Sequence, residues 1–167
     1  MSSPRPTLHM LCGKIAAGKS TLAGRLARAP ATVLLSEDHW LSRLYPAEIA
    51  SLADYVRCSA RLRDALGSHV ETLLRAGLSI VLDFPANTLA SRQWMRSLFE
   101  GAGADHRLHF LDLSDEACRA RLAHRNTSGT HEYVVSDAEF DAFTRHFVPP
   151  SREEGFETIV HREVLPR

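Results

Sequence analysis

Residues 13–20 constrain the fold more than any other part of this 167-residue sequence. They read Gly-Lys-Ile-Ala-Ala-Gly-Lys-Ser and match the pattern G-x-x-x-x-G-K-[ST] at every fixed position. An apolar run over 7–12 precedes them, and a helical pattern over 19–29 follows them, with Pro30 as its stop. A strand, a glycine-containing loop and a helix in this order predict the opening unit of an α/β domain.

Apolar runs and helical periodicities alternate along the rest of the chain. Further strands are expected over 31–35, 78–82, 108–113 and 158–161, and further helices over 47–76 with a break near Ser51, 88–102, 114–126 and 136–147. This alternation predicts one α/β domain over 1–167, with a parallel sheet covered by helices on both faces. The carboxyl ends of the strands would lie along one edge, where such sheets bind ligands.

Composition narrows the class of protein. Acidic and basic residues balance at 20 each, so the formal net charge is +0 and no overall field draws the chain to nucleic acid or to a membrane. The three cysteines lie far apart without a C-x-x-C pair, which favours free thiols in a reducing compartment. No apolar run approaches the roughly 18 residues of a membrane span. No signal-peptide pattern opens the sequence, and we expect a cytoplasmic protein.

The loop has the chemistry of a phosphate-binding site. Its glycines let backbone N–H groups turn inward, and the following helix N-terminus adds partial positive charge. Both lysines of the chain, Lys14 and Lys19, lie here; Lys19 would reach the β- and γ-phosphates of ATP, and Ser20 would bind Mg²⁺. The expected nucleotide-binding set is Gly13, Lys14, Ile15, Ala16, Ala17, Gly18, Lys19, Ser20 and Thr21.

Two acidic residues follow predicted strands. Asp38 comes after the second strand and is placed to take the proton of an acceptor hydroxyl, with Glu37 as the second choice for this base. Either residue could instead serve as a helix N-terminal acid stabilised by the helix dipole. Asp83 ends the third strand, an arrangement that predicts a ligand of a Mg²⁺-bound water, so Ser20 and Asp83 are the expected metal ligands.

Polar residues after the third and fourth strands complete the candidate site. Asn87 would contact substrate or cap the next helix. Arg121 and Arg125 are four residues apart and share a helix face, which suits two guanidinium groups aimed at the γ-phosphate. The alternative for this pair is a solvated helix face in an arginine-rich chain.

These features in this order resemble the small P-loop kinases. The closest similarity is to the ATP-binding proteins grouped with polynucleotide kinase, zeta toxins and chloramphenicol phosphotransferase, which often end in a segment similar to 147–156. The resemblance implies a three-layer P-loop NTPase fold with sheet order 2-3-1-4-5, and ATP and Mg²⁺ as cofactors. It implies Asp38 as general base, Arg121 and Arg125 as arginines of a small lid around 119–135, and residues 149–156 along the adenine.

One departure from that group concerns the substrate. Polynucleotide kinases typically carry arginine three residues after the base, where this chain has Leu41, with Arg43 nearby but out of register. This departure disfavours a nucleic-acid 5′-hydroxyl as acceptor. Arg43 and Asn87 are the candidate substrate contacts.

The sequence therefore predicts an ATP-dependent phosphotransferase that moves the γ-phosphate to a hydroxyl of a small-molecule acceptor. A nucleic-acid 5′-hydroxyl kinase or a zeta-toxin-like kinase is the first alternative. An ATPase or nucleotide-dependent switch without an acceptor is the second. No membrane partner is expected, and the sequence leaves the acceptor and the oligomeric state open.

Overall fold

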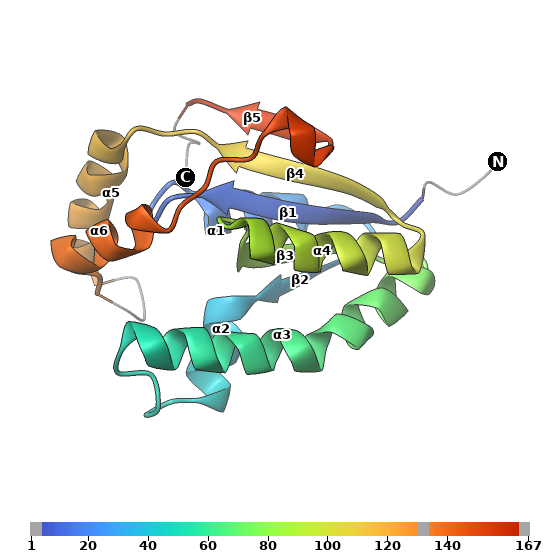
Figure 1. Cartoon of the computed structure of the whole chain (residues 1–167), viewed down its shortest axis with the longest axis horizontal. Helices are drawn as coiled ribbons and strands as arrows, with labels where there is room; N and C mark the ends of the chain where they lie inside the picture. The colour runs from blue at the N-terminus through green and yellow to red at the C-terminus, as the bar shows by residue number, and fades with distance from the viewer. Residues whose placement is uncertain (1–4, 130–133, 164–167) are drawn as a thin grey trace.

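The computed structural model describes residues 5–129 and 134–163. Five parallel strands form one sheet in the order β2-β3-β1-β4-β5 (Figure 1). The strands are β1 (Thr7–Gly13), β2 (Thr32–Ser36), β3 (Ser79–Pro85), β4 (Asp105–Leu111) and β5 (Thr158–His161). The predicted fold class and strand order are confirmed.

Helices cover both faces of this sheet. They are α1 (Lys19–Leu26), α2 (Glu37–Leu44), α3 (Leu52–Arg75), α4 (Leu89–Ala102), α5 (Asp115–Ser128), α6 (Asp137–Arg145) and the 3-10 helix η1 (Arg152–Glu154). A large core cluster joins one face to α3 and α4, and a second cluster joins the other face to α1, α5 and α6. In Figure 1 the strands point toward the side of the molecule where α5 and α6 lie. None of the described helices has the length and apolarity needed to cross a bilayer.

The central strand β1 contributes to both cores. Leu8 and Met10 are fully buried in the cluster shared with α3 and α4, whereas Leu11 is fully buried in the cluster on the opposite face. Burial on both faces explains why this strand reads as a nearly continuous apolar run. A well-packed central strand gives the loop that follows it a rigid starting point.

Helix α2 is the main departure from the sequence-based expectations. It begins directly after β2, with the Ser36 hydroxyl accepting a hydrogen bond from the backbone N–H of His39. A serine followed by two acids is typical of a helix start, so this signal was present in the sequence. Trp40 lies on α2 with 37% of its surface exposed.

Other boundaries differ by small amounts. Ser51 caps α3, at the expected break, and a capping box of Ser136 and Glu139 opens α6 near the start of the helix expected over 136–147. Strand β3 continues to Pro85, so Asp83 lies within the strand instead of after it. Residues 130–133, which belong to the predicted lid, lie outside the described ranges.

Candidate active site

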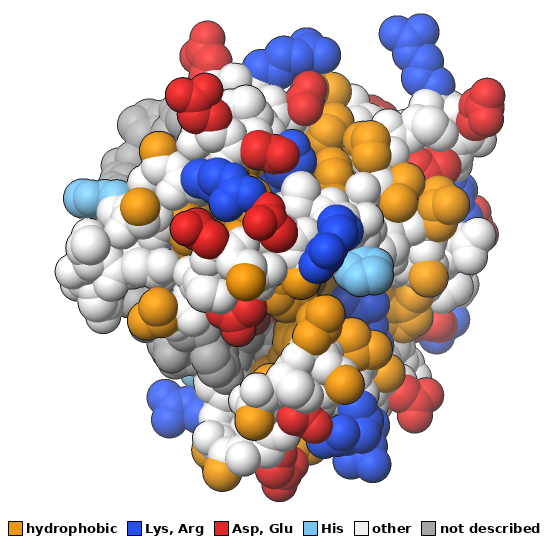
Figure 2. All heavy atoms as spheres, turned by 60° about the vertical axis from the view of Figure 1, so that its left-hand side comes forward, with side chains coloured by type: hydrophobic (Ala, Val, Ile, Leu, Met, Phe, Trp, Pro, Cys, Tyr) orange, Lys and Arg blue, Asp and Glu red, His pale blue; other side chains and the backbone are white. Residues whose placement is uncertain are grey.

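The predicted phosphate loop connects β1 to α1 at the edge of the sheet where the strands end. Figure 2 brings this side of the molecule forward, with acidic, basic and hydrophobic side chains interspersed over it. Two glycines are required by the loop geometry. A Cβ on Gly13 would lie 3.2 Å from both Ala17 Cβ and Leu111 Cβ, and Gly18 has φ of +104°.

Ala16 also adopts the left-handed region, with φ of 63°. This conformation costs free energy for a residue with a side chain and is found most often at functional sites. Alternating right- and left-handed residues point successive N–H groups into one concavity, which suits an anion. The loop thus has the backbone form of a phosphate cradle.

The side chain of Lys19 folds back over this loop. Its Nζ donates hydrogen bonds to the carbonyl oxygens of Gly13 at 2.6 Å and Lys14 at 2.9 Å. Burial lowers the pKa of Lys19, and the nearby carboxylates of Asp83 and Asp38 oppose this shift. The ammonium group therefore lies at the loop, with both acidic residues close enough to act on it.

Ser20 and Asp83 form a direct pair. The Ser20 hydroxyl donates a 2.8 Å hydrogen bond to Asp83 Oδ2. Burial raises the pKa of Asp83, and Asp38 adds to the shift, whereas the Ser20 hydrogen bond and the charge of Lys19 oppose it. A hydroxyl and a carboxylate are hard oxygen donors of the type that Mg²⁺ prefers. This donor set fits a cation that is held by one or two side chains and by phosphates.

The two neighbouring acids, Glu37 and Asp38, have different environments. The Glu37 side chain is only 1% exposed and accepts hydrogen bonds from Tyr55 Oη at 2.6 Å and from the Ser59 hydroxyl. Arg63 Nη2 lies 3.5 Å from Glu37 Oε1, the oxygen that also accepts from Ser59. Asp38, by contrast, is exposed. The second choice for the base, Glu37, is thus occupied in a buried network that joins α2 to α3.

The arginines of α5 divide into two groups. Arg121 Nε donates a 2.7 Å hydrogen bond to the carbonyl oxygen of Ala16, so this side chain lies against the loop. Arg125 is half-buried, its Nε has no hydrogen-bond partner within the described residues, and the charge of Asp38 acts on it. Arg119 instead contacts Asp141 and the Phe140 ring of α6. Arg121 therefore lies against the loop, and Arg125 lies within range of the charge of Asp38.

Lys14 also lies beside α5. Its Nζ is 2.5 Å from the Asp115 carboxylate and 5.7 Å from the centre of the Phe147 ring. This ion pair joins the variable part of the loop to the first turn of α5.

Asn87 does not cap the next helix, which was one of the two roles considered from the sequence. Thr88 caps α4, its hydroxyl accepting from the backbone N–H of Ser91. Both ends of the Asn87 carboxamide instead bind the first glycine of the loop: Oδ1 accepts from Gly13 N at 2.9 Å and Nδ2 donates to Gly13 O at 2.8 Å. The side chain thus contacts the loop backbone.

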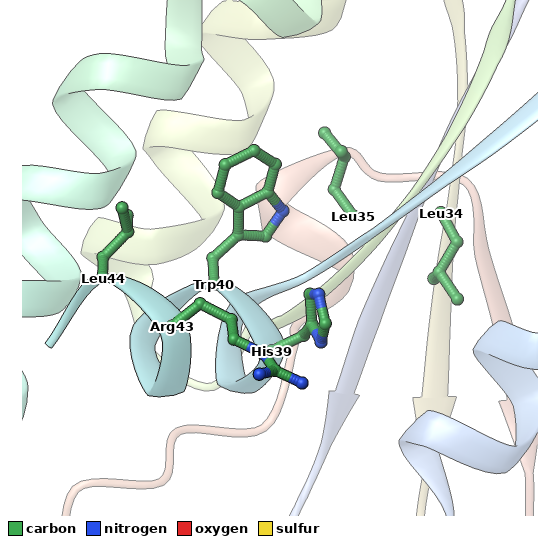
Figure 3. Close-up of a pocket in the computed structure, with 6 residues that line it drawn as sticks. All are labelled: Leu34, Leu35, His39, Trp40, Arg43 and Leu44. Atoms are coloured by element: carbon green, nitrogen blue, oxygen red, sulfur yellow. The ribbon is translucent and has the colours of Figure 1, made fainter. Parts of the chain in front are cut away.

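Arg43, the other candidate substrate contact, is not brought to the loop. It lines a surface cavity of about 350 Å³ between α2 and the edge strand β2, together with Leu34, Leu35, His39, Trp40 and Leu44 (Figure 3). Asp38 and Arg43 are five residues apart on α2, so they project from the helix in directions roughly 140° apart. Asp38 is absent from the lining of this cavity.

The α3 side of the site was not predicted from the sequence. Tyr55, Ser59 and Arg63, the partners of Glu37, recur every four residues and so share one face of α3. That polar stripe in an otherwise amphipathic helix was a usable signal. A second missed residue is Arg92, which is fully buried and forms a two-point ion pair with Glu154 at 2.7 and 3.2 Å. Its partner lies 62 residues away, and no spacing rule links the two.

The fold and the loop define a P-loop nucleotide-binding protein with the architecture of the small P-loop kinases. A model of the AAA domain family (AAA_33) matches residues 8–150, and the chain belongs to this family. No curated protein sequence matches the chain.

Solved structures share the fold. A provisionally assigned kinase from Chloroflexus aurantiacus J-10-fl superposes with a TM-score of 0.75 at 21% identity, covering 96% of this chain and 87% of that one. The APS kinase CysC of Mycobacterium tuberculosis, solved with AMPPNP and APS, gives 0.61 at 19%, covering 96% and 90%. A chain of the Pnkp1/Rnl/Hen1 RNA repair complex gives 0.68 at 20%, covering 87% of this chain and 45% of that one. At these identities the likeness establishes the fold.

Proposed function

We propose that this protein transfers the γ-phosphate of ATP to a hydroxyl group of a small-molecule acceptor. The observation that carries the proposal is the convergence of Lys19, the Ser20–Asp83 pair and Asp38 at the carboxyl edge of the sheet. Phosphoryl transfer needs positioning and charge stabilisation more than covalent chemistry. A cradle, a candidate metal site and an exposed carboxylate supply those needs.

Each residue has a separate task in this proposal. The backbone of residues 13–21 and Lys19 hold the β- and γ-phosphates, and Ser20 and Asp83 hold Mg²⁺. Asp38 orients the acceptor hydroxyl and accepts its proton, because it is the exposed acid of the Glu37–Asp38 pair. When bound, Mg²⁺ would neutralise the charge that develops on the phosphate oxygens.

Arg121 and Arg125 are proposed to stabilise the transferring phosphoryl group. Arg121 is held against the loop by its hydrogen bond to Ala16 O, and Arg125 carries a guanidinium Nε with no partner among the described residues. Two guanidinium groups near the γ-phosphate offset its charge in the transition state. The segment around 119–135 acts as a small lid on the single domain in this proposal.

A nucleic-acid acceptor is not favoured. Leu41, at the position where polynucleotide kinases typically carry arginine, is only 2% exposed and belongs to the hydrophobic core. On the side shown in Figure 2, the acidic and basic side chains of the described residues are interspersed and form no continuous basic surface. Phosphate-backbone binding depends on such a surface.

The experiment measures ADP release with Mg²⁺ and ATP across a panel of small alcohols, sugars and nucleosides, with a 5′-hydroxyl oligonucleotide included. We expect Asp38→Asn to lower kcat on a responsive acceptor by roughly 100-fold or more, because the general base is lost while the side-chain size is kept. His39→Ala is the matched control: His39 is the exposed neighbour on the same helix turn and should leave kcat unchanged.

Three outcomes would contradict parts of the proposal. Full activity of Asp38→Asn on a responsive acceptor would remove Asp38 as the base. Phosphorylation of the oligonucleotide alone would move the assignment to an end kinase. Hydrolysis of ATP without transfer to any acceptor would favour an ATPase or switch.

A further inference from the structure

The phosphate loop is connected to the carboxyl-terminal segment of the chain through Asn87. On one side, the Asn87 carboxamide binds both peptide groups of Gly13, as donor and as acceptor. On the other side, the backbone carbonyl of Asn87 accepts a 2.8 Å hydrogen bond from the N–H of Val148. One residue of the β3–α4 connection therefore contacts residues 74 positions before it and 61 positions after it.

The backbone of Asn87 is itself held in place. Arg92 Nη1 donates to the carbonyl oxygens of Ala86 at 2.8 Å and Val148 at 2.9 Å, while its Nε and Nη2 bind the Glu154 carboxylate. The N–H of Ala86 also donates to Leu11 O at 2.9 Å, beside the register shift of the β1–β3 pair. These contacts hold the backbone from which the Asn87 side chain reaches Gly13.

The carbonyl oxygen of Gly13 explains why this contact matters for nucleotide binding. It accepts two hydrogen bonds, one from Asn87 Nδ2 and one from Lys19 Nζ at 2.6 Å. In the proposed function Lys19 leaves this oxygen to reach the phosphates. A buried carbonyl that lost its last partner would destabilise that state, whereas Asn87 keeps it paired.

We infer that Asn87 is a positioning residue of the phosphate loop, which holds the Gly13 peptide groups in the conformation that receives the nucleotide phosphates. This inference rests on the nucleotide-binding part of the proposed function, and it does not depend on the acceptor. It assigns Asn87 no contact with either substrate. Its effect reaches the nucleotide through Gly13 and Lys19.

The test compares Asn87→Leu with Thr88→Ala by calorimetric titration of MgADP into the folded proteins. Leu has a similar size but neither donates nor accepts, so we expect Kd for MgADP to rise about tenfold or more. Thr88→Ala removes the α4 cap next to it and leaves the Gly13 contacts in place. Its Kd should equal that of the wild type, although its Tm should fall.

Thermal unfolding supplies an independent readout. A ligand that binds only the native state raises Tm by an amount that grows with the logarithm of 1 + L/Kd, where L is the free ligand concentration, so a weaker Kd gives a smaller rise at the same ligand concentration. Both variants should lose Tm without nucleotide, but only Asn87→Leu should show a smaller rise on addition of MgADP. If Asn87→Leu does not fold, Asn87→Asp serves in its place, since it keeps the size and the acceptor but cannot donate to Gly13 O.

The outcomes separate the two proposals. Equal Kd values for Asn87→Leu, or Asn87→Asp in its place, and the wild type would overturn the role of Asn87 alone. No binding of MgADP by the wild type would overturn both the inference and the nucleotide-dependent function. Binding that responds to Asn87 in a protein that phosphorylates no acceptor would support the inference and contradict only the transfer reaction.

Discussion

At the residue scale, burial gives neighbouring side chains of the same type different roles. Glu37 and Asp38 are adjacent acids, yet Glu37 lies inside the α2–α3 contact with three donors and Asp38 is exposed at the loop edge. A buried carboxylate with hydrogen bonds stabilises a local structure, whereas an exposed one can exchange protons with a substrate. Asp83 combines both features, since it is partly buried and also accepts a hydrogen bond from the Ser20 hydroxyl of the candidate metal site.

Asp83→Asn should stabilise the folded protein and weaken its use of Mg²⁺. Burial and Asp38 raise the pKa of Asp83, so its charged form is disfavoured in the folded state and destabilises it at neutral pH. We expect Asn to raise Tm, while the Mg²⁺ concentration for half-maximal activity rises about 10–100-fold. Thermal unfolding and a Mg²⁺ titration of ADP release measure the two effects. A lower Tm with an unchanged Mg²⁺ requirement would show that Asp83 has a structural role only.

At the element scale, the carboxyl-terminal segment is held to α4 by one buried ion pair. Arg92 is fully buried, and the Glu154 side chain is 15% exposed. Burial raises the pKa of Glu154, but its hydrogen bonds from Arg92 and the Ser151 backbone, with the charges of Arg92 and Arg96, together lower it. The segment also stacks on α4, since the Arg96 guanidinium lies 4.2 Å from the centre of the Phe156 ring.

Arg92→Met should lower the free energy of unfolding by about 3–5 kcal/mol, because it leaves Glu154 and two backbone carbonyls without their partner. Arg57→Met is the control, as Arg57 pairs with Asp54 at the surface of α3 and should change the free energy of unfolding much less. Urea unfolding measures both. Equal losses for the two variants would mean that the buried pair contributes no more than an exposed one.

At the scale of the whole molecule, three histidines form a hydrogen-bonded ladder across the sheet. His9 Nδ1 lies 3.1 Å from His109 Nε2, and His109 Nδ1 lies 3.2 Å from His161 Nε2, on β1, β4 and β5. Because the central ring uses a different nitrogen toward each neighbour, the three do not converge on one point. No metal-binding group of three or more acidic, histidine or cysteine residues is found in the described part of the chain.

This ladder should make the protein less stable in acid. Burial, the neighbouring imidazoles and Arg107 lower the pKa of His109 to about 4, and burial also lowers the pKa of His9 and His161. The unfolded chain therefore binds more protons below about pH 6.5, and stability falls as pH drops from there toward 4. For His109 alone the loss is on the order of 2–3 kcal/mol.

Urea unfolding at several pH values between 7.5 and 4.5 measures this loss. His109→Gln, which stays neutral, should flatten the dependence, and His39→Gln, at an exposed histidine outside the ladder, is the control substitution. Equal slopes for His109→Gln and the wild type would exclude the ladder as the cause.

The sequence by itself determined the parts of this protein that depend on local spacing. The loop at 13–20, the strand before it and the helix after it follow from one motif, and the alternation of apolar runs gave the five strands. These features are local, because strand and helix periodicities and the glycine requirement act over a few residues. Helix α2 was also readable from Ser36 and the two acids that follow it.

The tertiary structure decided which polar side chains meet. Asn87 binds Gly13 across 74 residues, Arg92 binds Glu154 across 62, and Glu37 is buried by a helix that begins 15 residues later. Contacts of this kind depend on how elements pack, and no spacing rule carries that information. The same packing places Arg43 beside the edge strand β2 and Asp38 within range of Lys19 in the loop. The candidate site therefore depends on tertiary contacts as well as on the local motif.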